Sequence, residues 1–484
     1  MRGGFAKACA QAINFILRVG SLMVLARLLT PKDFGLVAMV TVVTGVFSLL
    51  KDAGLSMATV QRASITTEQI DTLFWINMLV GAILGLLSVA IAPVLVVFYN
   101  EPRLFWVTVA LATGFIFNAA GVQHSALLQR QMRFVALAKI DVISQLISIA
   151  VGIGMVVGGC GYWALVVMAI MLPAISSVNM WLITSWIPRL PHREVGIRSM
   201  LRFGGIVTLN NIIVYIAYNF EKVLLGRFWG ADTLGIYGRA YQLINIPTDN
   251  LNSAIGGVVF SALSRLQDNP NRLKQYFLKG YSLVLALTIP VTVVFILYAE
   301  EIILIVLGPQ WKGAVLIFRL LTPTVLAFAL INPLGWLLIS LGLVERSLKI
   351  ALLIAPLVIM AYAIGLLYGP TGVALGYSIM MVLLIVPVSA WSIHGTMISA
   401  RDLLLVASRP IISVIVAAAP AFALQFFYGQ WLSPFMSLVI GVGLIFIVYI
   451  LMLLYVLGQK SFYLDLIREL IQRSYLNEKV SDGG

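Results

Sequence analysis

The chain has 484 residues, of which 61% are hydrophobic and only 11% are charged, and its mean hydropathy is +1.01. A soluble domain of this composition would lack a polar surface, so these values exclude a soluble globular protein and indicate a membrane protein. The net charge of +13 does not predict nucleic-acid binding, because the basic residues lie in short loops between apolar segments, where positive charge sets membrane orientation.

Apolar segments of about 20 residues recur along the whole chain, and each could cross a hydrocarbon layer of about 30 Å as a helix. We predict fourteen such helices. The first seven are 6–28, 35–60, 72–98, 104–127, 140–158, 162–186 and 204–229. The second seven are 234–263, 280–299, 314–340, 350–368, 373–394, 410–428 and 435–457. After them, Ser461–Tyr475 has apolar side chains on one helical face, which predicts an amphipathic helix on the cytoplasmic leaflet.

Basic residues are concentrated in alternate loops. The basic set of loops contains Arg62, Arg130, Arg133, Lys139, Arg189, Arg193, Arg198, Arg202, Arg265, Arg272, Lys274, Lys279, Arg346, Lys349, Arg401 and Arg409. The other set holds little beyond Lys32, Arg103 and Lys312. Because loops rich in Lys and Arg remain in the cytoplasm, this asymmetry places the first set and both termini there.

A short motif occurs twice. Leu25–Gly35, LARLLTPKDFG, returns 200 residues later at Leu225–Gly235 as LGRFWGADTLG. Each repeat contains six helices, and an even number means that both copies enter the membrane in the same direction. We therefore predict an all-α membrane protein with two six-helix lobes related by a pseudo-twofold axis along the membrane normal, followed by two extra helices. The expected divisions are 1–190, 191–400, 401–458 and a cytoplasmic tail, 459–484.

Polar side chains form stripes on the first and seventh predicted helices, which are repeat equivalents. Such residues inside a membrane usually face a bundle interior or a wet cavity. We expect the two stripes to face each other across a cleft between the lobes, with Arg18 and Lys222 as its cations. The neutral side chains expected to line this cleft are Gln11, Asn14, Asn210, Asn211, Tyr215, Tyr218 and, from the eighth helix, Asn245. The cleft would suit an anionic, sugar-like group.

Two carboxylates, Asp52 and Asp249, are candidates for ion coupling, and Pro247 removes a backbone hydrogen bond near the second. Each charged residue also has a structural alternative. Arg18 could snorkel or pair with a carbonyl, and Lys222 could form an ion pair with Glu221. Asp249 could cap a helix fragment, and Asp52 could satisfy loop amides.

Several functional classes lack their sequence signatures. No GxxxxGK[ST] phosphate loop is present, so ATP hydrolysis is not expected. The three histidines and two cysteines show no metal-ligand spacing, and the loops are too short for a catalytic domain. We therefore expect a protein that is not an enzyme and that needs no metal or cofactor.

The first repeat and the helix that follows it carry a family resemblance. The pattern LARLLTPKDFGLVAMV…DAGLSMATVQR resembles bacterial polysaccharide-export flippases, the Wzx-type branch of the multidrug/oligosaccharidyl-lipid/polysaccharide exporter superfamily. A second matching block is LGPQWKGA at Leu307–Ala314. The resemblance extends over nearly the full length in helix number and loop lengths.

The resemblance implies that the protein transfers an undecaprenyl-pyrophosphate-linked oligosaccharide from the inner to the outer leaflet of the bacterial cytoplasmic (inner) membrane, for exopolysaccharide, O-antigen or capsule assembly. It also implies a cationic cavity that alternates between inward-open and outward-open states, with Arg18 at the position of a phosphate-contacting cation. The assignment of Lys222 to the pyrophosphate rests on the stripe alone. A proton or sodium ion is a candidate coupling ion, and a polysaccharide polymerase is a candidate partner.

Two other functions compete with this hypothesis. A MATE-like, ion-coupled drug or metabolite antiporter would have the same fold, but for organic cations it would need an acidic, aromatic cavity. A membrane glycan polymerase or glycosyltransferase would need an extended loop with catalytic residues, which this sequence lacks.

Overall fold

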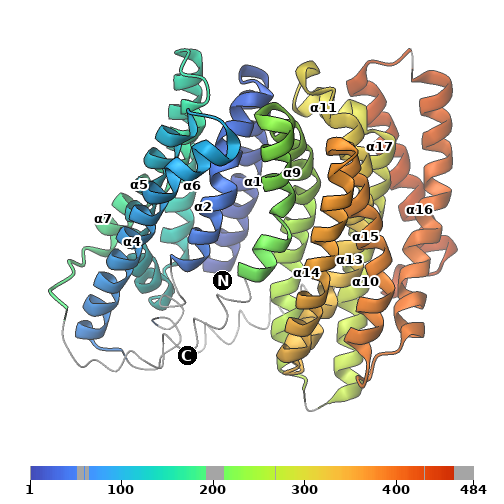
Figure 1. Ribbon diagram of the computed structural model, residues 1–484. Helices are drawn as coiled ribbons and strands as arrows, with labels where there is room; N and C mark the ends of the chain where they lie inside the picture. Colours follow the sequence, from blue (N-terminus) through green and yellow to red (C-terminus); the bar gives the residue numbers. More distant parts are fainter. Residues whose placement is uncertain are drawn as a thin grey trace. The chain divides into compact units, whose positions relative to one another are not determined.

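The computed structural model describes the chain apart from residue 1 and residues 52–58, 60–64, 192–211, 268, 430 and 463–484. It gives the backbone but not the side chains of 2–10, 249–254, 257–258 and 260–261. Within these described ranges the structure is helical and contains no strand (Figure 1). The contacts divide the chain into two compact units, Met1–Ile236 and Tyr237–Gly484. The predicted four-part division of the chain remains a prediction.

The described part of the first unit contains six complete long helices and the beginning of a seventh. These are α1 Arg2–Leu28, α2 Pro31–Leu50, α4 Thr67–Tyr99, α5 Leu104–Arg130, α6 Phe134–Val157, α7 Trp163–Thr184 and the first part of α9 Phe220–Ser264. Helix α5 packs against both α4 and α7, and α6 packs against α1 and α7. Small residues make this close packing possible, since a Cβ on Gly81 would overlap Ala119, and one on Gly121 would overlap Ser177.

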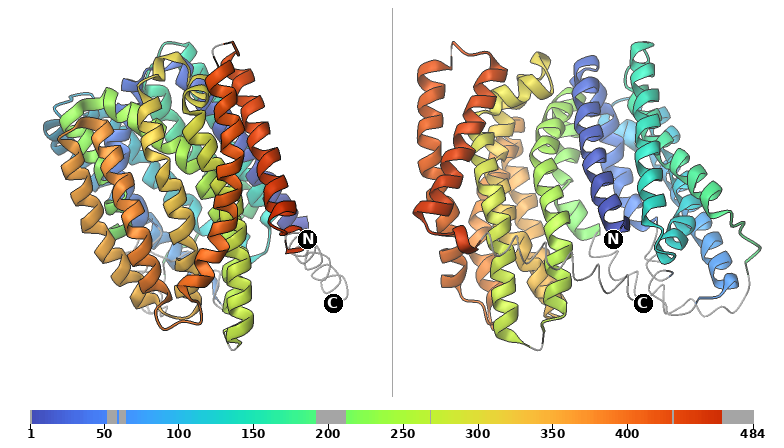
Figure 2. Two further views of the ribbon diagram at one scale, coloured as in Figure 1. Left: turned by 90° about the vertical axis from the view of Figure 1, so that its right-hand side faces the viewer. Right: turned by 180° about the vertical axis from the view of Figure 1, so that it is seen from behind.

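Among its described residues, the second unit contains the rest of α9 and eight further α-helices. These are α10 Pro270–Leu297, α11 Ala299–Val306, α12 Ala314–Leu321, α13 Pro323–Ser340, α14 Val344–Leu366, α15 Gly369–Ile393, α16 Ala400–Tyr428 and α17 Pro434–Leu451, the last continued by a π-helical segment, Met452–Val456. The views in Figure 2 show these helices from two further directions. The predicted amphipathic helix Ser461–Tyr475 lies almost entirely outside the described residues.

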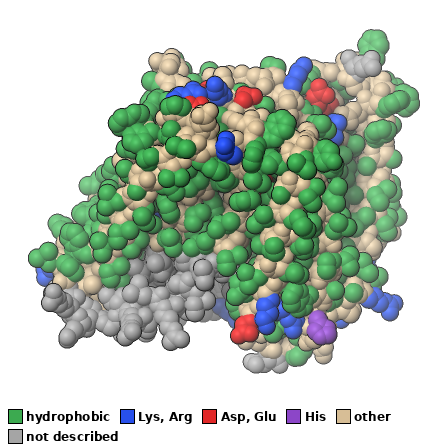
Figure 3. Space-filling model, in the orientation of Figure 1, with side chains coloured by type: hydrophobic (Ala, Val, Ile, Leu, Met, Phe, Trp, Pro, Cys, Tyr) green, Lys and Arg blue, Asp and Glu red, His purple; other side chains and the backbone are tan. Residues whose placement is uncertain are grey.

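Twelve helices in the described ranges are long and apolar enough to cross a membrane. Figure 3 agrees with this arrangement, since hydrophobic side chains cover the middle of the visible face and charged ones gather near its two ends. The other two predicted spans correspond to a partly undescribed stretch, 204–229, and to the second part of α9. Gly230, with a φ of 78°, breaks α9 between these two predicted helices. A total of fourteen spans and the symmetry of the lobes remain predictions.

Several helices begin earlier than hydropathy predicts, because their first turns are polar. Helix α4 begins at Thr67 rather than residue 72, and α16 at Ala400 rather than residue 410. Both starts carry a capping box: Thr66 pairs with Gln69, and Ser399 pairs with Asp402. These side chains satisfy the first backbone N–H groups of each helix. An average of hydropathy along the chain does not detect such a polar helix start.

The two copies of the repeated motif contact each other within the first unit. A Cβ on Gly35 would overlap the carbonyl group of Ala231, and a Cβ on Gly235 would overlap the carbonyl group of Pro31. Gly35 and Gly235 are equivalent in the repeat, and so are Pro31 and Ala231. The contact is therefore reciprocal, as a local twofold relation between the two copies would make it.

Candidate functional site

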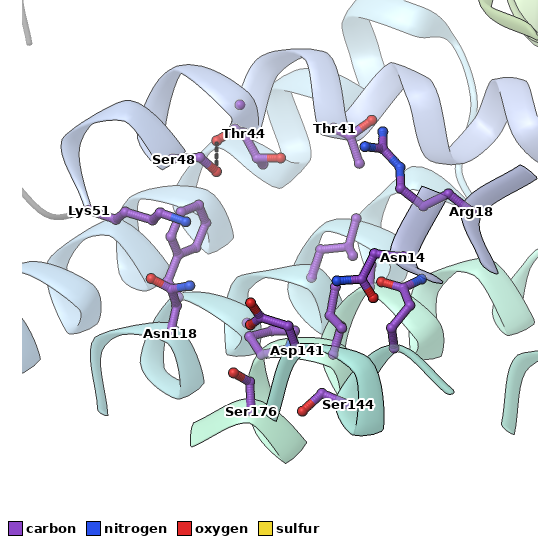
Figure 4. Close-up of a pocket in the computed structure, with 18 residues that line it drawn as sticks. Asn14, Arg18, Thr41, Thr44, Ser48, Lys51, Asn118, Asp141, Ser144 and Ser176 are labelled. Atoms are coloured by element: carbon purple, nitrogen blue, oxygen red, sulfur yellow. Dashed lines mark hydrogen bonds between the residues drawn. The ribbon is translucent and has the colours of Figure 1, made fainter. Parts of the chain in front are cut away.

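A cavity of about 650 Å³ lies inside the first unit and is lined by α1, α2, α5, α6 and α7. Most of its lining residues are polar or small. They are Asn14, Arg18, Thr41, Thr44, Gly45, Ser48, Lys51, Gly114, Asn118, Asp141, Ser144, Gln145, Ala169 and Ser176, with Leu111, Phe115, Leu172 and Pro173 as the larger apolar or ring-bearing members. Its wall comes from helices that are long and apolar enough to cross a membrane, so this cavity offers polar groups among apolar helices (Figure 4).

Three charged side chains line the cavity. Arg18 is exposed on α1, Lys51 follows the last residue of α2, and Asp141 is exposed on α6. In Figure 4 the Lys51 ammonium lies on one side of the cavity and the Arg18 guanidinium on the other, with the Asp141 carboxylate between them. Two cations and one carboxylate leave the described lining with a formal charge of +1.

The wall of the cavity also contains hydrogen-bonding atoms without partners. Asn14 Oδ1, Asn118 Oδ1 and Ser144 Oγ are buried and make no hydrogen bond, whereas Ser48 Oγ donates to the Thr44 carbonyl at 3.3 Å. Buried polar atoms in native proteins almost always have partners, from the protein, from water or from a ligand. Because these three oxygens are themselves buried, a ligand in the cavity would instead reach the more exposed lining side chains, such as Ser48.

A second, smaller cavity of about 230 Å³ shares part of this lining, namely Lys51, Asn118, Pro173 and Ser176. It adds Ser125 and Gln129 from the last turns of α5. The predicted topology places that end of α5 on the cytoplasmic side. The polar lining thus extends from Arg18 toward the end of α5 near Gln129, which gives room for more than a single phosphate group.

The structure brings two of the predicted site residues, Asn14 and Arg18, into the cavity. Gln11 is exposed on α1 and lies outside the cavity lining. Asn210, Asn211 and Asp52 lie outside the described residues, as does the side chain of Asp249. Tyr218 and Asn245 are half-buried and are not part of this lining.

The predicted residues Tyr215 and Lys222 make other contacts within the first unit. The Tyr215 hydroxyl donates to the Val42 carbonyl at 3.2 Å, and its ring lies beside Gly45 on α2. Lys222 Nζ donates to Asn219 Oδ1 at 2.6 Å and lies 4.0 Å from the fully buried Glu221. These contacts support the structural alternative for Lys222, which does not line this cavity, and its phosphate role remains a prediction.

Sequence reasoning missed Lys51, Asn118, Asp141 and Ser144. A signal for Asp141 was available, because it is an acidic residue inside the otherwise apolar helix α6. Asp141 lies on the fifth predicted helix, outside the repeat-equivalent polar stripes of the first, second, seventh and eighth helices. Lys51 belongs to the family motif, which by itself assigns it no role.

The unpartnered hydroxyl of Ser144 leads to a first prediction. Ser144→Ala should leave the thermal stability of the purified protein unchanged or raise it, because it removes a buried oxygen that has no partner. The matched control is Ser148→Ala, one turn further along α6, where Oγ donates to the Met168 carbonyl at 2.9 Å. That variant should lose about 1 kcal/mol. If Ser144→Ala lost more stability than Ser148→Ala, the Ser144 hydroxyl would not be without a partner.

A comparison with protein-family models matches residues 24–316 to a family described as "Polysaccharide biosynthesis protein". The chain belongs to this family. TuaB of Bacillus subtilis, a teichuronic acid biosynthesis protein, is 27% identical to this chain over 299 residues, which are 61% of each of the two chains. WzxC of Escherichia coli, a lipopolysaccharide biosynthesis protein, is 27% identical over 387 residues, 78% of each chain. These relatives confirm the predicted resemblance to polysaccharide-export proteins.

Solved structures show the same fold. The lipid II flippase MurJ in an inward closed conformation matches with a TM-score of 0.75 at 15% identity, covering 95% of this family member and 99% of MurJ. An inward-facing multidrug MATE transporter of the MOP superfamily matches with a TM-score of 0.61 at 13% identity, covering 81% and 95%. The predicted all-α exporter fold is therefore confirmed. At these identities the likeness concerns the fold alone.

Proposed function

We propose that this protein moves an undecaprenyl-pyrophosphate-linked oligosaccharide across the bacterial inner membrane. The observation that carries the proposal is the 650 Å³ cavity, whose lining combines two cations with exposed hydroxyl and half-buried amide side chains. A pyrophosphate carries too much charge to cross hydrocarbon without polar contacts that replace its water. The cavity supplies such contacts, while the polyprenyl chain remains in the lipid.

Each part of the head group has a matching part of the cavity. The guanidinium of Arg18 would bind phosphate oxygens through two N–H groups, and Lys51 would add a point charge. The exposed Ser48 and the half-buried Asn14 and Asn118 would form hydrogen bonds with sugar hydroxyls. Hydroxyl groups are common to all sugars, so this wall suits several glycans.

The charge of the cavity argues against the antiporter alternative. A drug antiporter for organic cations needs acidic groups that attract its substrate, whereas this lining has two cations for one carboxylate. The two relatives reported above are named for the biosynthesis of teichuronic acid and of lipopolysaccharide. The lipid-linked glycan therefore fits the site better than an organic cation does.

The finer parts of the proposal follow from the sequence. The positive loops place both termini in the cytoplasm, and alternating access would open the binding site to each leaflet in turn. Asp52 and Asp249 remain the candidates for coupling to a proton or sodium ion. Transport in vesicles with and without each gradient tests this, because indifference to both gradients would remove their role. Contact with a polysaccharide polymerase is a further proposal.

Deletion of the gene tests the proposed function directly. We expect polyprenyl-linked repeat units to accumulate in the cytoplasmic leaflet of the deletion strain, because the glycan continues to be assembled there but no longer crosses. The distribution is measured by labelling the glycan with an impermeant reagent in right-side-out and inside-out vesicles. The proposal would be disproved if the deletion strain and the parent showed the same distribution of these repeat units between the two leaflets.

A further inference from the structure

The cavity that we assign to the pyrophosphate contains a carboxylate, Asp141, which would repel that group. Asp141 comes from α6, which packs against α1 and α7. The charged groups that share the cavity with it are Arg18 from α1 and Lys51 at the end of α2; the described lining from α5, α6 and α7 is otherwise uncharged. Figure 4 shows the Asp141 carboxylate directed into the cavity, between Asn118 and Asn14.

A carboxylate at membrane depth is unfavourable unless it has a charged partner or a function. In the empty cavity Asp141 offsets part of the charge of Arg18 and Lys51, so fewer bare cations face the membrane interior. In the filled cavity the carboxylate and the substrate carry charge of the same sign, so they repel each other. The same side chain therefore stabilises the empty cavity and weakens substrate binding.

We infer that Asp141 acts as a built-in competitor of the substrate's pyrophosphate, an inference that rests on the proposed function. Its negative charge offsets part of the charge of the two cations when no substrate is present, and it repels the pyrophosphate when substrate enters. A transporter must bind its cargo strongly enough to load it and weakly enough to release it. Asp141 shifts this balance toward release, so it determines turnover more than capture.

The variant Asp141→Asn tests this inference, because it removes the charge and keeps the shape. The probe is citronellyl-pyrophosphoryl-N-acetylglucosamine, a short-chain pyrophosphate diester. Its binding to the full-length protein in detergent is measured by calorimetry, and its flipping is measured in proteoliposomes. We expect Asp141→Asn to bind the probe about tenfold more tightly and to flip it more slowly. Asp141→Glu should stay close to the unchanged protein in both measurements.

Two controls separate this role from a general effect of charge or packing. Asp232→Asn removes an exposed carboxylate of the first unit that lies outside the cavity, and it should change neither measurement. In the background of Lys51→Met, the gain in affinity from Asp141→Asn should shrink, because the carboxylate then has one cation fewer to compete for. A residue needed only for folding would lower affinity and flipping together.

The outcomes distinguish this inference from the proposed function. If Asp141→Asn binds the probe as the unchanged protein does, or more weakly, while Arg18→Ala loses binding, Asp141 is not a competitor and the proposed function stands. If Asp141→Asn binds more tightly but flips the probe at least as fast, the assigned role in release is wrong. If the unchanged protein does not bind the probe, the proposed function fails and this inference fails with it.

Discussion

Arg18→Ala should reduce flipping of a pyrophosphate-linked lipid by about a hundredfold, equivalent to a loss of ~3 kcal/mol. Arg18 lines the cavity, and its removal would leave substrate phosphate oxygens without a charge-assisted partner at membrane depth. Arg18→Lys should retain part of the activity, because the ammonium keeps the charge but loses the paired N–H geometry. Flipping of the short-chain probe in proteoliposomes measures both variants.

The matched control is Arg27→Ala, on the same helix but outside the cavity. Arg27 lies in the last turn of α1, where a cation complements the helix dipole, so its removal should affect stability slightly and flipping little. A thermal-unfolding curve for each variant shows whether the protein remains folded. Full activity of Arg18→Ala, with the fold intact, would remove this residue from the mechanism.

Gly35→Ala should destabilise the protein by about 3 kcal/mol, because the added methyl group would overlap backbone atoms of Ala231 rather than a movable side chain. Gly235→Ala should have a similar effect against Pro31. The double variant should lose less than the sum of the two, since the separation forced by one methyl group also makes room for the other. Thermal unfolding of the purified protein measures all three.

The control for these variants is Gly154→Ala on α6, where the added Cβ would meet no atom within 4 Å apart from its chain neighbours and the backbone of its own helix. There the substitution should stabilise the helix by about 0.5–1 kcal/mol, because alanine has the higher helix propensity. Equal stability of Gly35→Ala and Gly154→Ala would show that the motif contact tolerates a larger spacing.

Composition and periodicity predicted most of the fold. The hydropathy pattern located the long helices, since each span must satisfy its own backbone in lipid, but it placed the start of α16 at residue 410 instead of Ala400. It also placed the break in α9 near Gly230, where a φ of 78° favours glycine. The predicted helix 314–340 is confirmed as one apolar span, Ala314–Ser340, in which Pro323 lacks the N–H that would continue the hydrogen-bond ladder.

The site was predicted only in part. Arg18 and Asn14 could be found because a polar stripe on an apolar helix is visible in the sequence. Asp141 and Lys51 join them because α6 packs against α1 and because the end of α2 borders the same space. Such convergence depends on which helices become neighbours, and no spacing within one helix encodes it. The expected cleft between the lobes remains a prediction.

The reciprocal contact between Gly35 and Gly235 has a consequence for how the chain could diverge. In a half-length protein that paired with itself, one glycine would serve both halves of this contact, and every substitution would occur twice. Covalent fusion of the two copies removes that constraint. One copy can then keep Arg18 while the other has Tyr218 at the equivalent position. Two similar copies can therefore bind a substrate that is not itself symmetric.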